Sequence, residues 1–297
     1  MNVIEINHLT RDYGNNRGIF DVSFSVEKGE VIGFLGPNGA GKTTTIRHLM
    51  GFIKPQQGTV TINGLDCWTS HSEIQQNLGY IPGEMAFFDD MTGTEFLKFM
   101  EKYRNTHRRD RKKEMLDLFQ LDPNVKIKKM SKGTKQKLGI VVAFMHDPEV
   151  LILDEPTSGL DPLMQSRFID LILKEKARGK TILMSSHMFE EVERTCHRVC
   201  IIKEGRLVTV DFVEELKEQQ VKKYVVTLDT QKQAQAFSDK YPNVLSVVEN
   251  HVTVIVQKNL DEFIRLMNEF TVTNLSAPAQ SLEEIFLQYY GGQDNVQ

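Results

Sequence analysis

A glycine-rich stretch has the composition of a polyphosphate-binding loop, because glycines allow positive φ and let backbone N–H groups turn toward phosphate oxygens. It matches the pattern GxxxxGK[ST], and its candidate nucleotide contacts are Gly36, Pro37, Asn38, Gly39, Ala40, Gly41, Lys42, Thr43 and Thr44. Lys42 can neutralise the β and γ oxygens, and the Thr43 hydroxyl can bind Mg²⁺. The stretch predicts a site for a nucleoside triphosphate.

Two adjacent carboxylates follow an apolar run of strand length, Val150–Leu153. Asp154 is suited to hold Mg²⁺ through water, and Glu155 to orient or deprotonate an attacking water. An apolar strand that ends in Asp-Glu is common by chance, so this interpretation depends on the phosphate loop upstream. Together the two segments predict a magnesium-dependent triphosphatase, with Thr43 and Asp154 as the metal residues.

The elements around these residues fit a mainly parallel sheet. The run Val31–Leu35 predicts a strand before the loop, and a helix is expected to begin near Lys42. Uninterrupted apolar runs suit strands covered on both faces, and they recur at Val150–Leu153, Thr181–Met184 and Val199–Ile202. Leu163–Glu175 has the periodicity of a connecting helix. We therefore expect an α/β domain with ligands bound at the carboxyl ends of its strands.

Helical periodicity interrupts this pattern between about residues 80 and 147. Thr94–Tyr103 and Arg111–Phe119 both carry apolar residues at spacings of three and four. This segment predicts an inserted helical subdomain. The phosphate loop lies before the insertion and the carboxylate pair lies after it.

The length of 297 residues favours one large domain and a smaller appended one. We expect an α/β domain over residues 1–215 and a small α+β domain over residues 216–297. Patterning after about residue 222 gives the order βαββαβ, which is typical of a ferredoxin-like domain. A final helix is expected over Ser281–Tyr290.

Three further segments resemble motifs of the ATP-binding-cassette (ABC) ATPases in order and spacing. They are Met130–Thr134 before the Asp-Glu strand, Ser158–Asp161 after it, and Ser185–His187 at the end of the next strand. They correspond to the family's signature motif, D-loop and switch histidine. The resemblance covers residues 1 to about 215 and implies a P-loop NTPase fold of the ABC type that binds ATP and Mg²⁺.

The resemblance implies a head-to-tail homodimer with two ATP molecules at its interface. Ser131 is a good helix N-cap and Gly133 allows close approach, so this helix start would contact the ATP held by the partner's phosphate loop. Asp161 would lie across the interface, and Tyr13 would stack on adenine. His187 would contact the γ-phosphate, which makes Glu155, His187 and Lys42 the expected catalytic residues.

Two segments depart from the commonest family form. Gly83 stands where the family usually has a glutamine that contacts Mg²⁺ and water, so either Glu84 substitutes or the loop is only a joint to the helical subdomain. The signature reads Ser-Lys-Gly-Thr, which keeps the serine and the second glycine.

Phe87 and Phe88 are either anchors for a membrane partner or core residues.

Composition limits the other expectations. The net charge of −4 argues against dedicated nucleic-acid binding, and the basic run His107–Lys113 fits a solvated helix face better than a membrane or RNA contact. The apolar runs fall far short of the ~20 residues that cross a bilayer, and the N-terminus lacks a signal-peptide pattern. Three cysteines suit a reducing cytoplasm.

We therefore predict the ATP-hydrolysing subunit of an ABC transporter, peripheral at the cytoplasmic face of the membrane and bound to a separate integral membrane permease. The tail resembles that of ATP-binding subunits of bacterial drug, antibiotic and peptide exporters. The alternatives are a soluble ABC ATPase that acts as a clamp on a non-membrane partner, or a nucleotide sensor. Glu155 and His187 disfavour the sensor, because binding alone does not require them.

Overall fold

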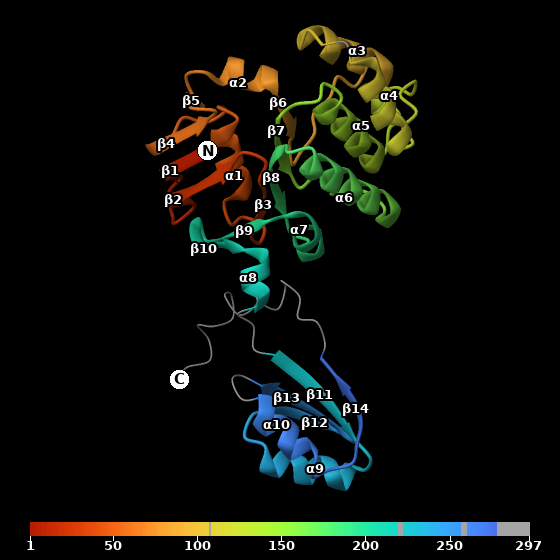
Figure 1. Ribbon diagram of the computed structural model, residues 1–297. Helices are drawn as coiled ribbons and strands as arrows, with labels where there is room; N and C mark the ends of the chain where they lie inside the picture. The colour runs from red at the N-terminus through yellow and green to blue at the C-terminus, as the bar shows by residue number, and fades with distance from the viewer. Residues whose placement is uncertain (107, 219–221, 257–259, 278–297) are drawn as a thin grey trace. The chain divides into compact units, whose positions relative to one another are not determined.

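The computed structural model describes residues 1–106, 108–218, 222–256 and 260–277 (Figure 1). These residues form two compact units, which divide between Val213 and Glu214. None of the described helices is long and apolar enough to cross a membrane. The helix predicted over Ser281–Tyr290 lies outside the described residues.

The first unit begins with an antiparallel sheet that the apolar pattern did not predict. Its order is β2-β1-β4-β5, and the strands are β1 (Asn2–Asp12), β2 (Gly18–Glu27), β4 (Gln57–Ile62) and β5 (Leu65–Asp66). Strands β1 and β2 span 11 and 10 residues. Register shifts between Ile6 and Leu9 interrupt the alternation of side chains that would have marked them as long.

The second sheet confirms the mainly parallel arrangement. Its order is β10-β9-β3-β8-β7-β6, and its strands are β3 (Val31–Leu35), β6 (Leu78–Ile81), β7 (Val150–Asp154), β8 (Thr181–Ser186), β9 (Arg198–Lys203) and β10 (Arg206–Phe212). Only β10 runs antiparallel to its neighbour. Every residue of β3, β7 and β8 is buried, which explains their uninterrupted apolar character.

Seven α-helices accompany these sheets in the described part of the first unit. They are α1 (Lys42–Leu49), α2 (His71–Asn77), α3 (Gly93–Tyr103), α4 (Arg109–Leu118), α5 (Lys132–Phe144), α6 (Pro162–Ala177) and α7 (Phe189–Thr195). Helices α3 and α4 both pack against α5 and form the helical lobe, set apart from the antiparallel sheet in Figure 1. Tyr80 lies in β6, so the lobe begins later than the sequence indicated.

The basic run before and within α4 is not a fully solvated face. Arg111 is buried and pairs with Glu175 on α6 and Glu114 on its own helix. A buried guanidinium is stable only when carboxylates pair with it, and Glu175 lies far away in the sequence. The pairing could not be read from local spacing, so the expectation of a solvated face is wrong for Arg111.

The second unit is an antiparallel sheet with the order β12-β13-β11-β14. The predicted βαββαβ order is confirmed by β11 (Lys222–Leu228), α9 (Gln231–Lys240), β12 (Val244–Val248), β13 (His251–Val256), α10 (Leu260–Met267) and β14 (Val272–Ser276). Phe237 on α9 and Phe263 on α10 are fully buried in its core, where their rings contact each other edge to face. Helix α8 (Val213–Glu218) begins where the first unit ends.

Candidate nucleotide-binding site

The glycine-rich loop connects the carboxyl end of β3 to the first turn of α1. Gly41 precedes the helix with a φ of 114°, and no side chain caps the N-terminal N–H groups. A Cβ at Gly41 would lie 2.7 Å from Ile19, and one at Gly36 would lie 2.6 Å from the carbonyl oxygen of Ile202. The loop is therefore too close to its neighbours for larger residues, while its uncapped helix start is available to an anion.

Lys42 is the only buried side chain among the polar candidates of this loop. Its Nζ donates to the carbonyl oxygens of Gly36 at 2.7 Å and Pro37 at 3.2 Å, which holds the ammonium inside the curve of the loop. Burial lowers the pKa of Lys42, while the carboxylates of Glu155 and Asp154 oppose that change. The ammonium is thus held where a polyphosphate would replace its backbone partners.

Asp154 ends β7 and is fully buried. Its Oδ1 accepts a hydrogen bond from Ser185 Oγ at 2.5 Å, whereas Oδ2 has no hydrogen-bond partner. A buried carboxylate oxygen without a partner is costly, and a hydrated cation would satisfy it. The described residues contain no cluster of three or more His, Cys, Asp or Glu side chains suited to a metal, so phosphate and water oxygens would complete the shell.

Glu155 follows with a φ of 48°, which is unusual for a residue with a side chain. Its N–H donates to Ser185 Oγ at 3.0 Å, so one serine hydroxyl contacts both acidic residues. The Glu155 carboxylate lies 3.7 Å from Lys42 Nζ and 3.5 Å from His187 Nδ1. The carboxyl ends of the neighbouring strands β3, β8 and β7 therefore bring the predicted lysine, histidine and glutamate together.

Gly83 lies beside Asp154 in the loop after β6. A Cβ at Gly83 would be 3.0 Å from the unpartnered Oδ2 of Asp154, and the neighbouring Glu84 is exposed. This loop thus brings only main chain to the carboxylate.

The other sequence candidates occupy two helix starts and one exposed loop. Ser131 caps α5 by accepting from Thr134 N at 3.2 Å, and Asp161 caps α6 by accepting from Met164 N at 3.0 Å. A Cβ at Gly133 would lie 2.7 Å from the carbonyl oxygen of Gly159, so the start of α5 lies against the loop before α6. The side-chain hydrogen bonds of Ser131 and Asp161 are made within their own helix starts and do not reach Lys42. Tyr13 is 51% exposed in the loop after β1.

The sequence reasoning missed two residues that hold this site in place. Ser185 had been noted only as part of the histidine segment, yet it contacts both acidic residues. Gln136, buried on α5, donates from Nε2 to the carbonyl oxygen of Pro156 at 2.6 Å and so ties the lobe helix to the loop after Glu155. The position of Ser185 directly after an apolar run was the available signal for that residue, whereas Gln136 lies between two lysines and no local pattern marks it.

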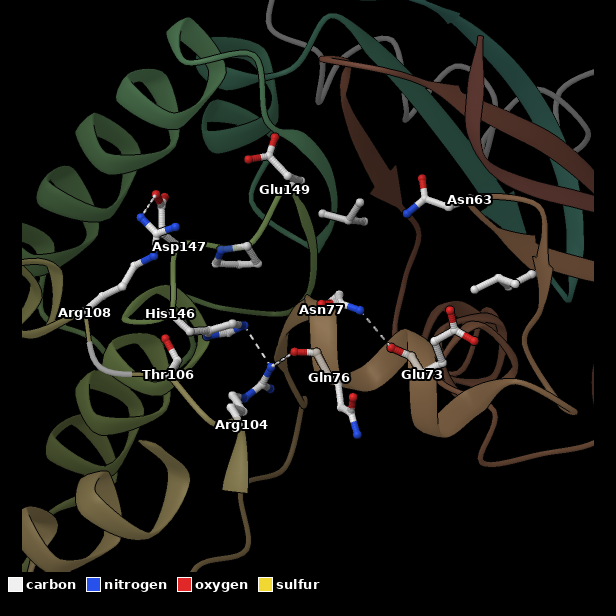
Figure 2. Close-up of a pocket in the computed structure, with 13 residues that line it drawn as sticks. Asn63, Glu73, Gln76, Asn77, Arg104, Thr106, Arg108, His146, Asp147 and Glu149 are labelled. Carbon is white, nitrogen blue, oxygen red and sulfur yellow. Dashed lines mark hydrogen bonds and ion pairs between the residues drawn. The ribbon is translucent and has the colours of Figure 1, made fainter. Parts of the chain in front are cut away.

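A pocket of about 610 Å³ lies away from these residues (Figure 2). Arg104, at the end of α3, donates to the carbonyl oxygen of Leu78 at 2.9 Å and contacts His146 Nε2 at 2.8 Å. Burial, and then the nearby Arg104 charge, lowers the pKa of His146 to about 4, so the ring is neutral. The pocket adjoins Val150, the first residue of β7, whereas Asp154 is the last. It belongs to the opposite edge of the sheet from the glycine-rich loop.

Residues 19–158 match the family model described as ABC transporter. The chain is 34% identical to the bacitracin transport ATP-binding protein of Bacillus licheniformis, over 98% of both chains. This chain belongs to the ABC transporter ATP-binding proteins. The ABC ATPase is also 35% identical to a linearmycin resistance ATP-binding protein of Bacillus subtilis, over 70% of this chain and 68% of that one.

Solved structures agree with this assignment. An ATP-binding subunit of an ABC transporter superimposes with a TM-score of 0.67 at 30% identity, over 73% of this chain and 92% of that one. A dimeric bacterial ABC transporter cassette shares the fold, with a TM-score of 0.64 at 22% identity. The ABC ATPase is therefore the ATP-binding subunit of a transporter, in which ATP hydrolysis drives transport, and such subunits pair with permeases.

Proposed function

We propose that this ABC ATPase hydrolyses ATP at the site formed by Lys42, Asp154, Glu155 and His187, with Glu155 as the general base. Water attacks the γ-phosphorus, its proton passes to the Glu155 carboxylate, and the bond to the β–γ bridging oxygen breaks. Lys42 neutralises the β and γ oxygens, and His187 contacts the γ-phosphate. Mg²⁺, when bound, would be held by Thr43 and Asp154 and would neutralise the same phosphate charge.

The nucleotide site is completed by a second copy of the chain. The phosphate loop of one protomer, from Gly36 to Thr44, and the helix start at Ser131 and Gly133 of its partner bind the same ATP, and Asp161 lies at that interface. Support comes from geometry: α5 is a second capped helix start whose hydrogen bonds do not reach Lys42. Because each triphosphate bridges two protomers, hydrolysis removes the contact that favours the closed dimer.

The membrane permease docks on the helical lobe, and the subunit works at the cytoplasmic face of the membrane. Phe88, Phe99 and Tyr103 are exposed and form a ladder, with ring centroids 5.7 Å and 6.4 Å apart. Phe87 contacts Phe96 edge to face, and the Phe96 ring in turn contacts Phe88 and Phe99. Large exposed aromatic clusters favour protein partners. Export of an antibiotic or peptide is the proposed direction, by analogy with the bacitracin and linearmycin proteins.

The ATPase domain spans residues 1–215, and the second unit is an appended ferredoxin-like domain that spans residues 216–297. The sheet order β12-β13-β11-β14 and the two helices that connect β11 to β12 and β13 to β14 support this topology. The domain carries no proposed catalytic residue.

The observation that carries this function is the Glu155 carboxylate, placed between Lys42 Nζ at 3.7 Å and His187 Nδ1 at 3.5 Å. Glu155→Gln should lower ATP hydrolysis by about 10²–10⁴-fold, the range for loss of a general base. ATP binding should persist, and light scattering during gel filtration should detect an ATP-dependent dimer. Glu190→Gln is the matched control, because this exposed glutamate lies on α7 outside the site. Hydrolysis by Glu155→Gln at the wild-type rate would show that another group is the base.

A further inference from the structure

Arg11 lies directly against the proposed adenine platform. Its guanidinium carbon is 5.2 Å from the centroid of the Tyr13 ring, a geometry at which a cation and an aromatic face attract each other. The loop that carries Tyr13 is held by Gln56, whose Oε1 accepts from Asp12 N at 2.6 Å. One face of an otherwise exposed ring is therefore occupied by a cation within the same chain, and the ring stands in a fixed place.

The Arg11 side chain has unused hydrogen-bonding capacity. Its Nε is buried and has no hydrogen-bond partner. A guanidinium has five N–H donors and no acceptor, so this position can be satisfied only by an acceptor that comes from elsewhere. Buried donors without partners are rare in native proteins, and each one calls for an explanation such as a catalytic role or a bound water or ion.

Arg11 shares a face of the antiparallel sheet with a residue that packs against the glycine-rich loop. It pairs across β1 and β2 with Ile19, and residues that pair directly share one face of the sheet. Ile19 packs against Gly41 of the phosphate loop, since a Cβ there would be 2.7 Å away. Burial, opposed by a hydrogen bond to the Thr44 carbonyl, lowers the pKa of His48 on α1, and the Arg11 charge adds to this effect. Arg11 thus lies close to Tyr13 and, through its charge, to His48 in the last turn of α1.

We propose that Arg11 is a nucleotide-positioning residue. Its guanidinium covers one face of Tyr13 and leaves the opposite face for the base, and its Nε–H donates to an oxygen of the sugar and α-phosphate portion of ATP. The inference rests on the proposed ATP site and adds a contact that links the base platform to the phosphate loop. Arg11 touches none of the proposed reacting groups, so its loss should affect binding more than turnover.

The test compares ATP with inorganic tripolyphosphate, which lacks the base and sugar, by calorimetric titration of the full chain. Arg11→Gln keeps most of the side-chain length and removes the charge and the planar cation. It should weaken ATP binding by about tenfold or more, as expected for the loss of a charged hydrogen bond, and change tripolyphosphate affinity by less than about twofold. The KM for ATP should rise while kcat changes little. Arg11→Lys should show a smaller loss, because the ammonium keeps the charge without the fork of donors.

Arg17→Gln is the matched control, because it removes the same charge from an exposed position in the loop after Tyr13. It should leave both affinities unchanged. Equal losses for ATP and tripolyphosphate in Arg11→Gln, or an unchanged ATP affinity, would overturn the proposal. Lys42→Ala distinguishes this outcome from failure of the site itself, since it should abolish binding of both ligands. Retained binding in Lys42→Ala would instead refute the proposed phosphate site.

Discussion

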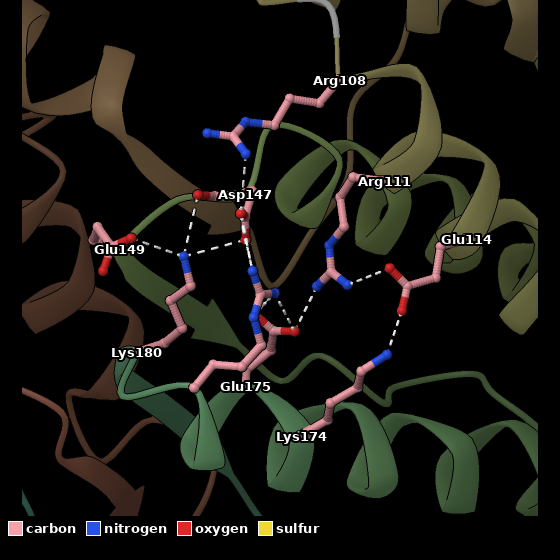
Figure 3. A network of polar contacts seen from close by, with 9 residues as sticks. Arg108, Arg111, Glu114, Asp147, Glu149, Lys174, Glu175 and Lys180 are labelled. Carbon is pink, nitrogen blue, oxygen red and sulfur yellow. Dashed lines mark hydrogen bonds and ion pairs between the residues drawn. The ribbon is translucent and has the colours of Figure 1, made fainter.

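The ion pair between Arg111 and Glu175 should be a major link between the helical lobe and the rest of the first unit. Arg111 on α4 contacts Glu175 on α6 at 2.5 Å, and their side chains are only 9% and 2% exposed (Figure 3). Arg111 also contacts Glu114 at 2.7 Å, and Arg178 contacts Glu175 at 3.0 Å. Glu175→Leu would therefore leave Arg111 buried with one partner instead of two.

The size of the effect follows from burial. Removing one partner of a buried pair costs about 3–5 kcal/mol, because the remaining charge is left in a poorly solvating environment. The surviving contact with Glu114 places Glu175→Leu near the lower end, about 3 kcal/mol. For a unit of this size that corresponds to a fall in Tm of roughly 6–12 °C. Replacing both residues, Arg111→Leu with Glu175→Leu, should restore most of this loss, since an apolar pair leaves no buried charge.

Urea unfolding followed by circular dichroism measures each free energy of unfolding, and the double-mutant cycle isolates the pair. Lys174→Ala is the control on the same helix. Its pair with Glu114 is 59% and 40% exposed, so the expected loss is only about 0–1 kcal/mol. If the double variant lost as much stability as the two single variants together, the contribution would come from packing, and the reasoning from uncompensated charge would be refuted.

Two further predictions concern the residues proposed to bind phosphate and metal. Because burial lowers the pKa of Lys42, its ammonium is lost at a lower pH than that of an ordinary lysine, near 10.4. ATP affinity, titrated from pH 7 to pH 10, should fall before that value is reached, and a flat profile would contradict this. Gly83→Ala places a Cβ 3.0 Å from Asp154 Oδ2. Overpacking at this position costs ~1–3 kcal/mol, so the half-saturating Mg²⁺ concentration for hydrolysis should rise roughly fivefold or more. Glu84→Ala, in the exposed neighbour, should leave the Mg²⁺ dependence unchanged.

The positions of the central residues were predictable because these residues occupy equivalent places on successive parallel strands. Lys42 follows β3, Asp154 ends β7, and His187 follows β8, and the carboxyl ends of parallel strands share one edge of the sheet. A polar residue at the end of an apolar run can therefore be predicted to lie at that edge, and no knowledge of tertiary contacts is needed. The same reasoning holds for β9, which the pattern also located.

The missed features depend on contacts that no local pattern encodes. Arg111 stands in a basic run, and its burial depends on Glu175, 64 residues later in the chain. Arg11 was passed over because its missing hydrogen-bond partner becomes visible only when its surroundings are known. Strand β1 gives no clear periodic signal because His8, with a φ of 50°, breaks its alternation. In each case tertiary context or an irregular backbone overrode the periodic signal.

Two residues at the end of β8 contact the acidic residues of the proposed site, which links motifs that are separate in the sequence. Ser185 accepts from the Glu155 N–H and donates to Asp154, while His187, two residues later, contacts the Glu155 carboxylate. A left-handed φ at a glutamate costs about 1–2 kcal/mol and persists only where the surroundings fix it. Here the Ser185 hydroxyl and carbonyl oxygen, at 3.0 Å and 3.2 Å from the Glu155 N–H nitrogen, supply that constraint. A shift of this one strand end would therefore move the proposed base, the proposed metal residue and the γ-phosphate contact together.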